Sequence, residues 1–327
     1  MNNENNSESS KNKCWKILFL KKWHPQPTVQ GTKYLFFFVG VVFIIFGIVI
    51  NIFNAKIKEK QIDNYEDLCK GQTTCKIPFT LDEDFTDTVY FFYGLDNFYQ
   101  NHRRYIKSKS SSQLSGTMIS SSDANTFCSP IVHNSDLLPE QQYVYYANSY
   151  TNSSITQPKS LNPQDIAVPC GLIARSFFND TFQLYNAATQ QRVPIDESGI
   201  AWPDDKGNKF KMDQKNKDKY WIDVENEHFI VWMRTSGLPN FRKLWGIVKE
   251  KLPKGNYYIM VNNIYDVSNF KGHKNIILST SGPFGGKNQF LSIAFIVVGS
   301  ISVLIAVAFF IKQRTTDNRF GNSRHQD

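Results

Sequence analysis

Histidines, acidic pairs and one glycine-rich segment are the parts of this sequence whose residue types could support catalysis or metal binding. The six histidines are scattered, and none has the H-x-x-x-H or H-E-x-x-H spacing of zinc sites. The acidic pairs Asp82 with Asp84 and Asp204 with Asp205 lack the ligand series of a calcium loop, so we interpret them as solvated turns. GPFGGKN at 282–288 lacks the Ser or Thr that completes a phosphate loop. The sequence therefore predicts no catalytic residue, no metal site and no cofactor.

Four of the five cysteines lie in the central part of the chain, at Cys69, Cys75, Cys128 and Cys170. An even number in an exported segment suggests two disulfides, with three possible pairings. Closure of the shorter loops favours Cys69 with Cys75 and Cys128 with Cys170. Zinc binding is the competing use, but no C-x-x-C pair is present.

Two N-x-S/T sequons fall in the same central part, at Asn152 and Asn179. Such a site receives a glycan only if its segment enters the secretory lumen. Both are therefore predicted glycosylation sites, and they agree with an exported, oxidised central domain.

Two long apolar runs flank this central part. Residues 34–53 and 290–311 contain no charged side chain, and about 20 residues at 1.5 Å per residue cover the roughly 30 Å of a bilayer core. A buried helix of a soluble core would be shorter and would keep a polar stripe. A cleaved signal peptide would lie closer to the start and would have a shorter apolar run. We predict two transmembrane helices.

The distribution of charge predicts how the chain crosses the membrane. Residues 1–33 carry six Lys against two acids, and residues 312–327 carry four basic side chains against two acids. Both tails are therefore expected in the cytosol, with 54–289 as an extracellular or lumenal domain. That domain holds 27 basic and 25 acidic residues, which argues against nucleic-acid binding.

Short aromatic and β-branched runs predict a mostly-β, antiparallel, β-sandwich-like ectodomain. The expected strands cover 88–95, 143–150, 228–233, 256–261 and 275–280. A few short helices are expected, near 94–105 and at 239–251, where apolar residues recur at helical spacing. The Ser-rich stretch 107–123 is interpreted as a loop, and 134–166 as a longer polar excursion.

Small residues interrupt both apolar runs, at Gly40, Gly47, Gly299, Ser300 and Ser302. Neither run contains a charge, so two such helices cannot enclose a polar pathway by themselves. Small residues permit close packing against another helix, and we interpret the spans as docking helices for a partner. Before the first span, residues 14–23 interleave aromatic and aliphatic residues with Lys, which suits contact with membrane lipids or with a partner's cytosolic face.

Long ordered blocks of the sequence resemble the ligand-effect modulator family, the accessory β-subunits of type-IV P-type ATPases that flip phospholipids. These blocks are YGLDNFYQNHRRYIKS (93–108), PCGLIARSFFNDTF (169–182), IAWPDDKGNKF (200–210), HFIVWMRTSGLPNFRKLWG (228–246) and 252–302. The W-x-P-x-x-T pattern at 23–28 also fits.

The resemblance implies a non-catalytic subunit that pairs with the catalytic α-subunit of such an ATPase. Family membership further implies support of folding, of exit from the endoplasmic reticulum and of an efficient transport cycle. It also implies residence in the endoplasmic reticulum, the Golgi and endosomes, and the plasma membrane, and it matches Asn179 to a family glycosylation position. A free-standing surface receptor or adhesin is the alternative from another class, followed by an ectoenzyme.

Six residues are predicted to contact the partner. Trp23, Pro25 and Thr28 belong to a cytosolic tail that has no core of its own to fill. Asn101, Arg103 and Arg104 lie in an aromatic and Arg-rich block, and these residue types suit binding surfaces. The neighbouring Phe91 and Phe92 are assigned to packing.

Overall fold

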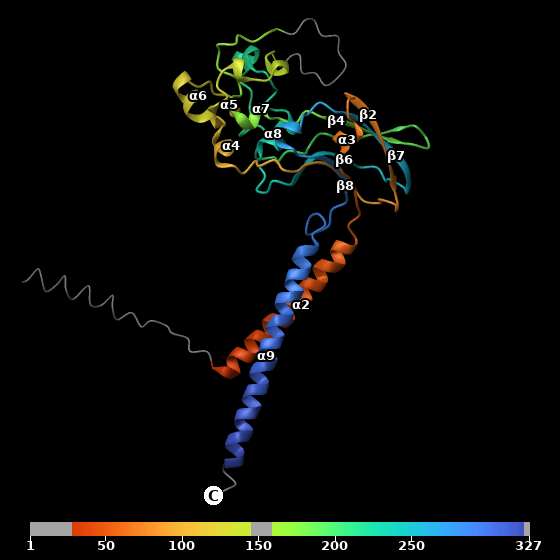
Figure 1. Cartoon of the computed structure of the whole chain (residues 1–327), viewed down its shortest axis with the longest axis vertical. Coiled ribbons are helices and arrows are strands. Elements are labelled where there is room, and N and C mark those ends of the chain that lie inside the picture. The colour runs from red at the N-terminus through yellow and green to blue at the C-terminus, as the bar shows by residue number, and fades with distance from the viewer. Residues whose placement is uncertain (1–27, 145–158, 324–327) are drawn as a thin grey trace, which may run out of the picture. The chain divides into compact units, whose positions relative to one another are not determined.

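The computed structural model describes residues 28–144 and 159–323 and divides the chain into two compact units. One unit contains the two terminal segments, Met1–Asn54 and Asn288–Asp327, and the other contains Ala55–Lys287. The first unit is helical and the second is mostly β (Figure 1).

Within its described residues the helical unit contains α2 (Val29–Ala55) and α9 (Gln289–Ser323). Each includes a stretch that is long and apolar enough to cross a membrane, Gln30–Ala55 with mean hydropathy 2.9 and Gln289–Thr315 with mean hydropathy 2.8. Large apolar side chains on both helices are exposed, as lipid-facing positions require. The two expected apolar helices are therefore confirmed as candidate membrane spans.

Among the described residues of the second unit, eight strands form two antiparallel sheets. One sheet has the order β1-β8-β3-β6, with bounds Glu59–Ile62, Lys274–Ser279, Val89–Leu95 and Phe241–Val248. The other has the order β2-β7-β4-β5, with bounds Thr74–Leu81, Gly255–Asn262, Thr181–Asn186 and Arg192–Val193. The prediction of a mostly-β ectodomain with antiparallel sheets is confirmed.

Aromatic side chains from the two sheets share one core. Phe91 on β3 and Trp245 on β6 come from the first sheet, and Phe182 on β4 comes from the second. The Phe182 ring centroid lies 5.3 Å from that of Phe91 and 5.2 Å from that of Trp245. All three side chains are buried, so the sheets pack face to face as a sandwich.

Short helices connect and flank the sheets. The α-helices are α3 (Tyr65–Leu68), α4 (Arg103–Lys107), α5 (Ser111–Leu114), α6 (Ser121–Cys128), α7 (Leu172–Arg175) and α8 (Glu227–Met233). Single 3₁₀ turns occur at η1 (Asn134–Asp136), η2 (Pro139–Gln141) and η5 (Ser268–Phe270), with a longer one at η4 (Gln214–Lys219). The expectation of a few short helices is confirmed.

Several expected elements are wrong in type. Residues 228–233 form α8 rather than a strand, because the Asn226 side chain caps its first turn by accepting from the N–H groups of His228 and Phe229. The helix expected at 239–251 is strand β6, whose residues pair with β3. The loop expected at 107–123 contains α5 and the start of α6, each with a Ser side chain at its N-cap.

Other expected elements are confirmed in whole or in part. Strands β3, β7 and β8 lie where 88–95, 256–261 and 275–280 predicted them. Of the helix expected near 94–105, only the turn that begins at Arg103 is helical. Tyr143 makes a single bridge with Ser160, and most of the strand expected at 143–150 lies outside the described residues.

Candidate partner-binding surfaces

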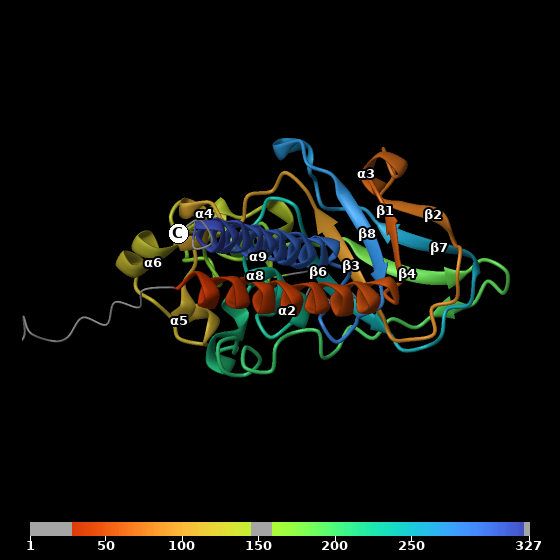
Figure 2. The same cartoon turned by 90° about the horizontal axis from the view of Figure 1, so that it is seen from below.

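A seam of glycines joins α2 and α9, which run side by side (Figure 2). A Cβ atom on Gly40 would lie 2.8 Å from the carbonyl oxygen of Gly299, and one on Gly299 would lie 2.8 Å from that of Gly40. Gly47 approaches the backbone of Ile296 and Ser292 in the same way. The backbones therefore come so close that a side chain would not fit at these positions.

Polar side chains fasten both ends of this helix pair. Asn54 donates to the carbonyl of Asn288 at 2.7 Å and accepts from its N–H at 3.3 Å. At the other end Lys33 donates to the side chain of Gln313 at 2.7 Å. The three glycines thus pack the two spans of this chain against each other, as small residues permit, while docking of the spans to a partner stays a prediction. Ser300, by contrast, is exposed.

The three residues predicted as cytosolic contacts can be placed only in part. Trp23 and Pro25 lie outside the described residues. Thr28 is exposed, and its hydroxyl accepts from the N–H of Gly31 at 3.1 Å while its carbonyl accepts from the N–H of Thr32 at 2.9 Å. Thr28 therefore caps the start of α2, a structural role that the sequence reasoning missed.

The three residues predicted as ectodomain contacts gather at the start of α4. Asn101, Arg103 and Arg104 are all exposed. The Asn101 amide donates to the carbonyl of Gly237 at 2.8 Å, which ties the loop before α4 to the loop after α8. Phe91 is fully buried, and the ring of Phe92 carries the Arg242 guanidinium 4.9 Å from its centroid, so both pack within the domain.

Next to these loops stands an exposed tryptophan that the sequence reasoning did not single out. Trp202 is 62% exposed, and the Arg234 guanidinium lies 4.9 Å from its ring centroid. Arg234 in turn pairs with Asp205, which also accepts from Lys209 at 2.7 Å. Asp205 is buried, so the interpretation of this residue as part of a solvated turn was wrong. Its ion pairs lower its pKa, and the bond from Arg234 is the main cause. In the sequence, the signal for this exposed side chain was the presence of an aromatic residue, Trp202, in the polar segment 200–210.

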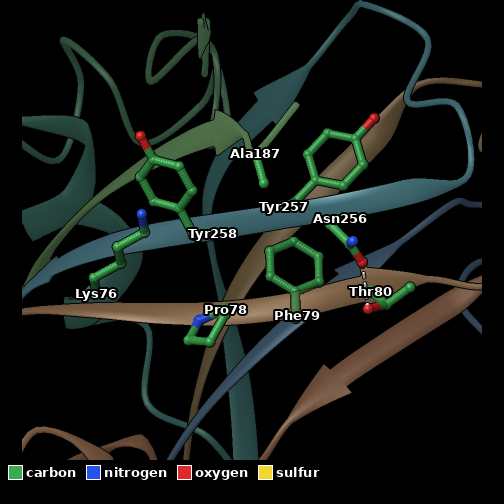
Figure 3. A pocket seen from close by; sticks show the side chains of 8 residues that line it. All are labelled: Lys76, Pro78, Phe79, Thr80, Ala187, Asn256, Tyr257 and Tyr258. Atoms are coloured by element: carbon green, nitrogen blue, oxygen red, sulfur yellow. Dashed lines mark hydrogen bonds between the residues drawn. The ribbon is translucent and has the colours of Figure 1, made fainter. Parts of the chain in front are cut away.

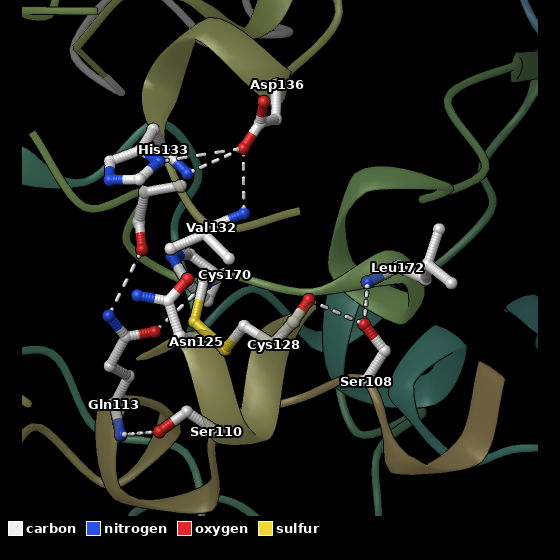
Figure 4. The surroundings of a disulfide bond; sticks show 12 residues. Ser108, Ser110, Gln113, Asn125, Cys128, Val132, His133, Asp136, Cys170 and Leu172 are labelled. Carbon is white, nitrogen blue, oxygen red and sulfur yellow. Dashed lines mark hydrogen bonds and ion pairs between the residues drawn. A yellow bond between two sulfur atoms is a disulfide. The ribbon is translucent and has the colours of Figure 1, made fainter. Parts of the chain in front are cut away.

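A disulfide joins the short helices to the segment before α7 (Figure 4). Cys128 is bonded to Cys170, with 5.5 Å between their Cα atoms. Gln113 bridges the same segments, since its amide donates to the carbonyl of Ala167 at 3.1 Å and accepts from the N–H of Cys170 at 2.9 Å. Ser108 donates to the carbonyl of Cys128 at 2.8 Å. A second bond joins Cys69 to Cys75, beside α3 and β2.

The predicted glycosylation residues fall in different parts of the chain. Asn152 lies outside the described residues. Asn179 is half-buried in the loop before β4, and the next residue, Asp180, is fully buried. Asp180 accepts from the N–H groups of Ile264 and Tyr265, both at 2.6 Å, which holds the sequon backbone in place.

A buried ion pair connects this sequon to β8. Lys274 donates to Asp180 at 2.6 Å, to the side chain of Asn263 at 2.5 Å and to the carbonyl of Tyr265 at 2.7 Å. The Tyr65 hydroxyl donates to the same carboxylate at 2.6 Å. Burial raises the pKa of Tyr65 and lowers that of Lys274, while the Asp180 carboxylate raises both. All three donors of the ammonium group are therefore satisfied.

A second buried lysine lies at the end of α8. Lys243 on β6 donates to the carbonyls of Val231 at 3.1 Å, Trp232 at 3.3 Å and Arg234 at 2.5 Å. These carbonyls belong to the C-terminal end of α8, where the helix dipole is negative. Burial lowers the pKa of Lys243 to about 7.

Among the described residues, one acidic and histidine group has ligand atoms close enough to share a cation. Glu66, Asp67 and His273 place these atoms within 4.8 Å of one another. The contacts of Glu66 already account for the arrangement, because its two oxygens bond to the His273 ring at 2.6 Å and to the N–H of Lys274 at 2.8 Å. Glu66 raises the pKa of His273, which favours this charged pair.

The described residues define a class of protein: two adjacent candidate membrane spans at the two ends of a chain, with a disulfide-containing β-sandwich between them. The chain belongs to the LEM3 (ligand-effect modulator 3) family / CDC50 family, which it matches over residues 52–319. The family resemblance of the sequence is thereby confirmed.

Curated relatives agree with this assignment. The chain is 35% identical to cell cycle control protein 50A of Mus musculus, over 94% of this chain and 90% of the relative. It is 34% identical to ALA-interacting subunit 3 of Arabidopsis thaliana, over 88% and 81%. It is 30% identical to cell cycle control protein 50B of Homo sapiens, over 91% and 93%. The similarity therefore covers 81–93% of each of these relatives.

Proposed function

We propose that this chain is the non-catalytic accessory subunit of a type-IV P-type ATPase that flips phospholipids. Family membership over residues 52–319 is the observation that carries the proposal, and a plant relative is itself named as an interacting subunit. The exposed apolar surface of α2 and α9 gives a partner in the membrane a large area to contact. In this role the chain supports folding, exit from the endoplasmic reticulum and the transport cycle of the catalytic subunit.

The proposed topology places both tails in the cytosol and residues 54–289 in the lumen or outside the cell. The excess of basic residues in both tails supports it, as do the paired cysteines and the sequons of the central domain. The complex then resides along the secretory route, from the endoplasmic reticulum through the Golgi and endosomes to the plasma membrane.

Two surfaces are proposed to contact the ATPase besides the spans. The first is the cytosolic segment with Trp23, Pro25 and Thr28. The second is the exposed start of α4 with Asn101, Arg103 and Arg104. Arginine in such a position can pair with acidic groups of a partner.

Co-purification in a mild detergent tests the proposal. The tagged full-length chain should retain a large multi-span ATPase in equal amount. Substituting Trp23 and Pro25 by Ala, or Arg103 and Arg104 by Ala, should reduce the retained ATPase several-fold while the ectodomain stays folded. Lys107→Ala is the matched control, because Lys107 is exposed on the same helix α4. If no ATPase is retained by the unmodified chain, a free-standing receptor or adhesin becomes the better hypothesis.

A further inference from the structure

The outer face of the sheet β2-β7-β4 is a regular surface of polar and aromatic side chains. Strand register places the outward residues in four rows, which are Thr74, Asn262 and Thr181; Lys76, Met260 and Gln183; Pro78, Tyr258 and Tyr185; and Thr80, Asn256 and Ala187. Inward residues alternate with them and are buried, as Ile77, Ile259 and Leu184 show. We call these twelve residues the outer platform.

The chemistry of the outer platform suits a carbohydrate. It contains hydroxyl and amide groups, aromatic rings and one ammonium group, but no carboxylate. The rings of Tyr185 and Tyr258 stack at 5.0 Å, and the Lys76 ammonium lies 3.8 Å from the Tyr258 centroid. Sugars offer hydroxyl groups to amides and C–H faces to aromatic rings. Tyr258 is buried, so the half-buried ring of Tyr185 is the one that presents a face to such a ligand.

The platform ends in a hollow of about 340 Å³ (Figure 3). Pro78 and Thr80 of β2 and Asn256 and Tyr258 of β7 contribute to its lining, and Thr80 donates to the Asn256 side chain at 2.8 Å. Phe79, Tyr257, Lys76 and Ala187 complete the lining. This volume is in the range of sites that hold small ligands.

The sequon at Asn179 lies in the loop directly before β4, the strand that forms one side of the platform. Asp180, Phe182 and Leu184 are directed into the core, where Asp180 bonds to Lys274 and Tyr65. In an extended chain the residues between them face the opposite way, so Thr181, Gln183 and Tyr185 face outward. Asn179 is half-buried and comes two residues before Thr181, the β4 member of the first row of the platform.

We propose that the N-glycan of Asn179 lies along the outer platform and covers it. The first sugars lie over Thr181, Asn262 and Gln183, and the outer arm reaches Tyr185 and the hollow. Six residues separate Asn179 from Tyr185, a distance of about 20 Å along a strand, which a branched oligosaccharide of the kind transferred in the endoplasmic reticulum can span. The occupant is thus attached to this chain, at the edge of the surface that it covers.

Glycan release from the native protein tests the proposal. The full-length chain is produced with high-mannose glycans, and endoglycosidase H removes the glycan from Asn179 while mass spectrometry of the glycopeptide follows the loss. Release from the native chain should be at least about tenfold slower than from the denatured chain, because the glycan must leave the platform before it is cleaved. Tyr185→Thr should make native release several-fold faster, since Thr keeps the strand but removes the ring.

Tyr99→Thr is the matched control, because Tyr99 is 57% exposed and lies in the segment between β3 and α4, away from the platform. Equal thermal midpoints of the variants show that the faster release is not caused by unfolding. Gln183→Ala is a second variant of the platform, and it should also speed release.

Three results would overturn the proposal. The first is an Asn179 without a glycan in the mature protein, and the second is equal release from native and denatured chains. The third is a Tyr185→Thr variant that loses ATPase co-purification without any change in glycan release, because the platform would then bind a protein. Loss of ATPase binding by the unmodified chain would instead contradict the proposed function and would leave the glycan placement standing.

Discussion

The interactions that stabilise the helix pair differ from those that stabilise the ectodomain. The helices α2 and α9 meet where side chains are absent, at Gly40, Gly47 and Gly299. The ectodomain core is instead filled by large rings and contains two buried ammonium groups, Lys243 and Lys274. In a bilayer the hydrophobic effect does not drive two helices together, so close backbone approach has to supply the attraction. In water the burial of rings supplies it.

The two buried lysines extend this comparison into the ectodomain. Lys274 is paired with a buried carboxylate, whereas Lys243 is held by three carbonyls at the end of α8. A full opposite charge compensates the burial of Lys274, but only partial charges compensate that of Lys243. We therefore expect the two positions to respond differently to substitution and to pH.

The largest expected loss of stability follows from Lys274→Met. This change leaves the Asp180 carboxylate buried without its counter-ion, and loss of one partner from such a pair costs about 3–5 kcal/mol. Denaturant unfolding of the ectodomain, followed by tryptophan fluorescence, measures the loss. Lys76→Met is the control, because Lys76 is exposed above Tyr258 and its removal should cost no more than about 1 kcal/mol. A loss at Lys274 no larger than at Lys76 would contradict the assigned role of the pair.

The next largest effect is expected at the helix seam. Gly299→Leu forces a side chain against the carbonyl of Gly40 and should destabilise the helix pair by about 1–3 kcal/mol. The thermal midpoint of the detergent-solubilised chain measures this effect. Ser300→Leu is the matched control at the adjacent position, since Ser300 is exposed and bonds within its own helix. Equal midpoints for the two variants would show that α2 and α9 do not depend on this close approach.

Sequence reasoning was most successful where one pattern determines one structure. Uncharged runs at 34–53 and 290–311 predicted the two helices, because only a helix satisfies its backbone within an apolar segment of that length. Short runs of aromatic and β-branched residues predicted β3, β7 and β8. Residues 228–233 failed because a short continuous apolar run fits a buried helix as well as a strand. The cap at Asn226, two residues earlier, was the available signal.

The contacts of single side chains could be predicted far less well. The sequence indicated that Gly40 and Gly299 pack against a helix, but it could not say which helix. It placed Asp205 in a solvated turn, whereas Arg234, 29 positions later, buries it in an ion pair. Asp205 lies in a turn and Arg234 follows α8, so their pairing depends on how these two segments pack, which no local pattern in a single sequence determines. The contact residues Asn101, Arg103 and Arg104 are exposed as a binding role requires, and that role stays a prediction.

The pH dependence of stability should distinguish the two lysines. The folded pKa of Lys243 is about 7 and its unfolded pKa is near 10.5, so the unfolded chain binds more protons between these values. The contribution of Lys243 therefore destabilises the fold at neutral pH and becomes less unfavourable as the pH rises from about 7 to about 10.5. Denaturant unfolding across this pH range gives the free energy of unfolding of the unmodified chain and of Lys243→Met. The difference between the two free energies, followed as the pH changes, isolates the contribution of Lys243. A difference that does not change with pH would contradict the lowered pKa.

The smallest expected effect concerns Thr28, at the start of α2. Thr28→Ala removes the cap from the N–H of Gly31 and should destabilise the start of α2 by about 1 kcal/mol, whereas Thr28→Ser keeps the hydroxyl and should not. Hydrogen exchange of the first turn of α2 measures the cap, and ATPase co-purification measures binding. If Thr28 acts only as a cap, Thr28→Ser restores both properties. If its methyl group contacts the partner, Thr28→Ser restores the slow exchange but not the binding, which separates the two roles.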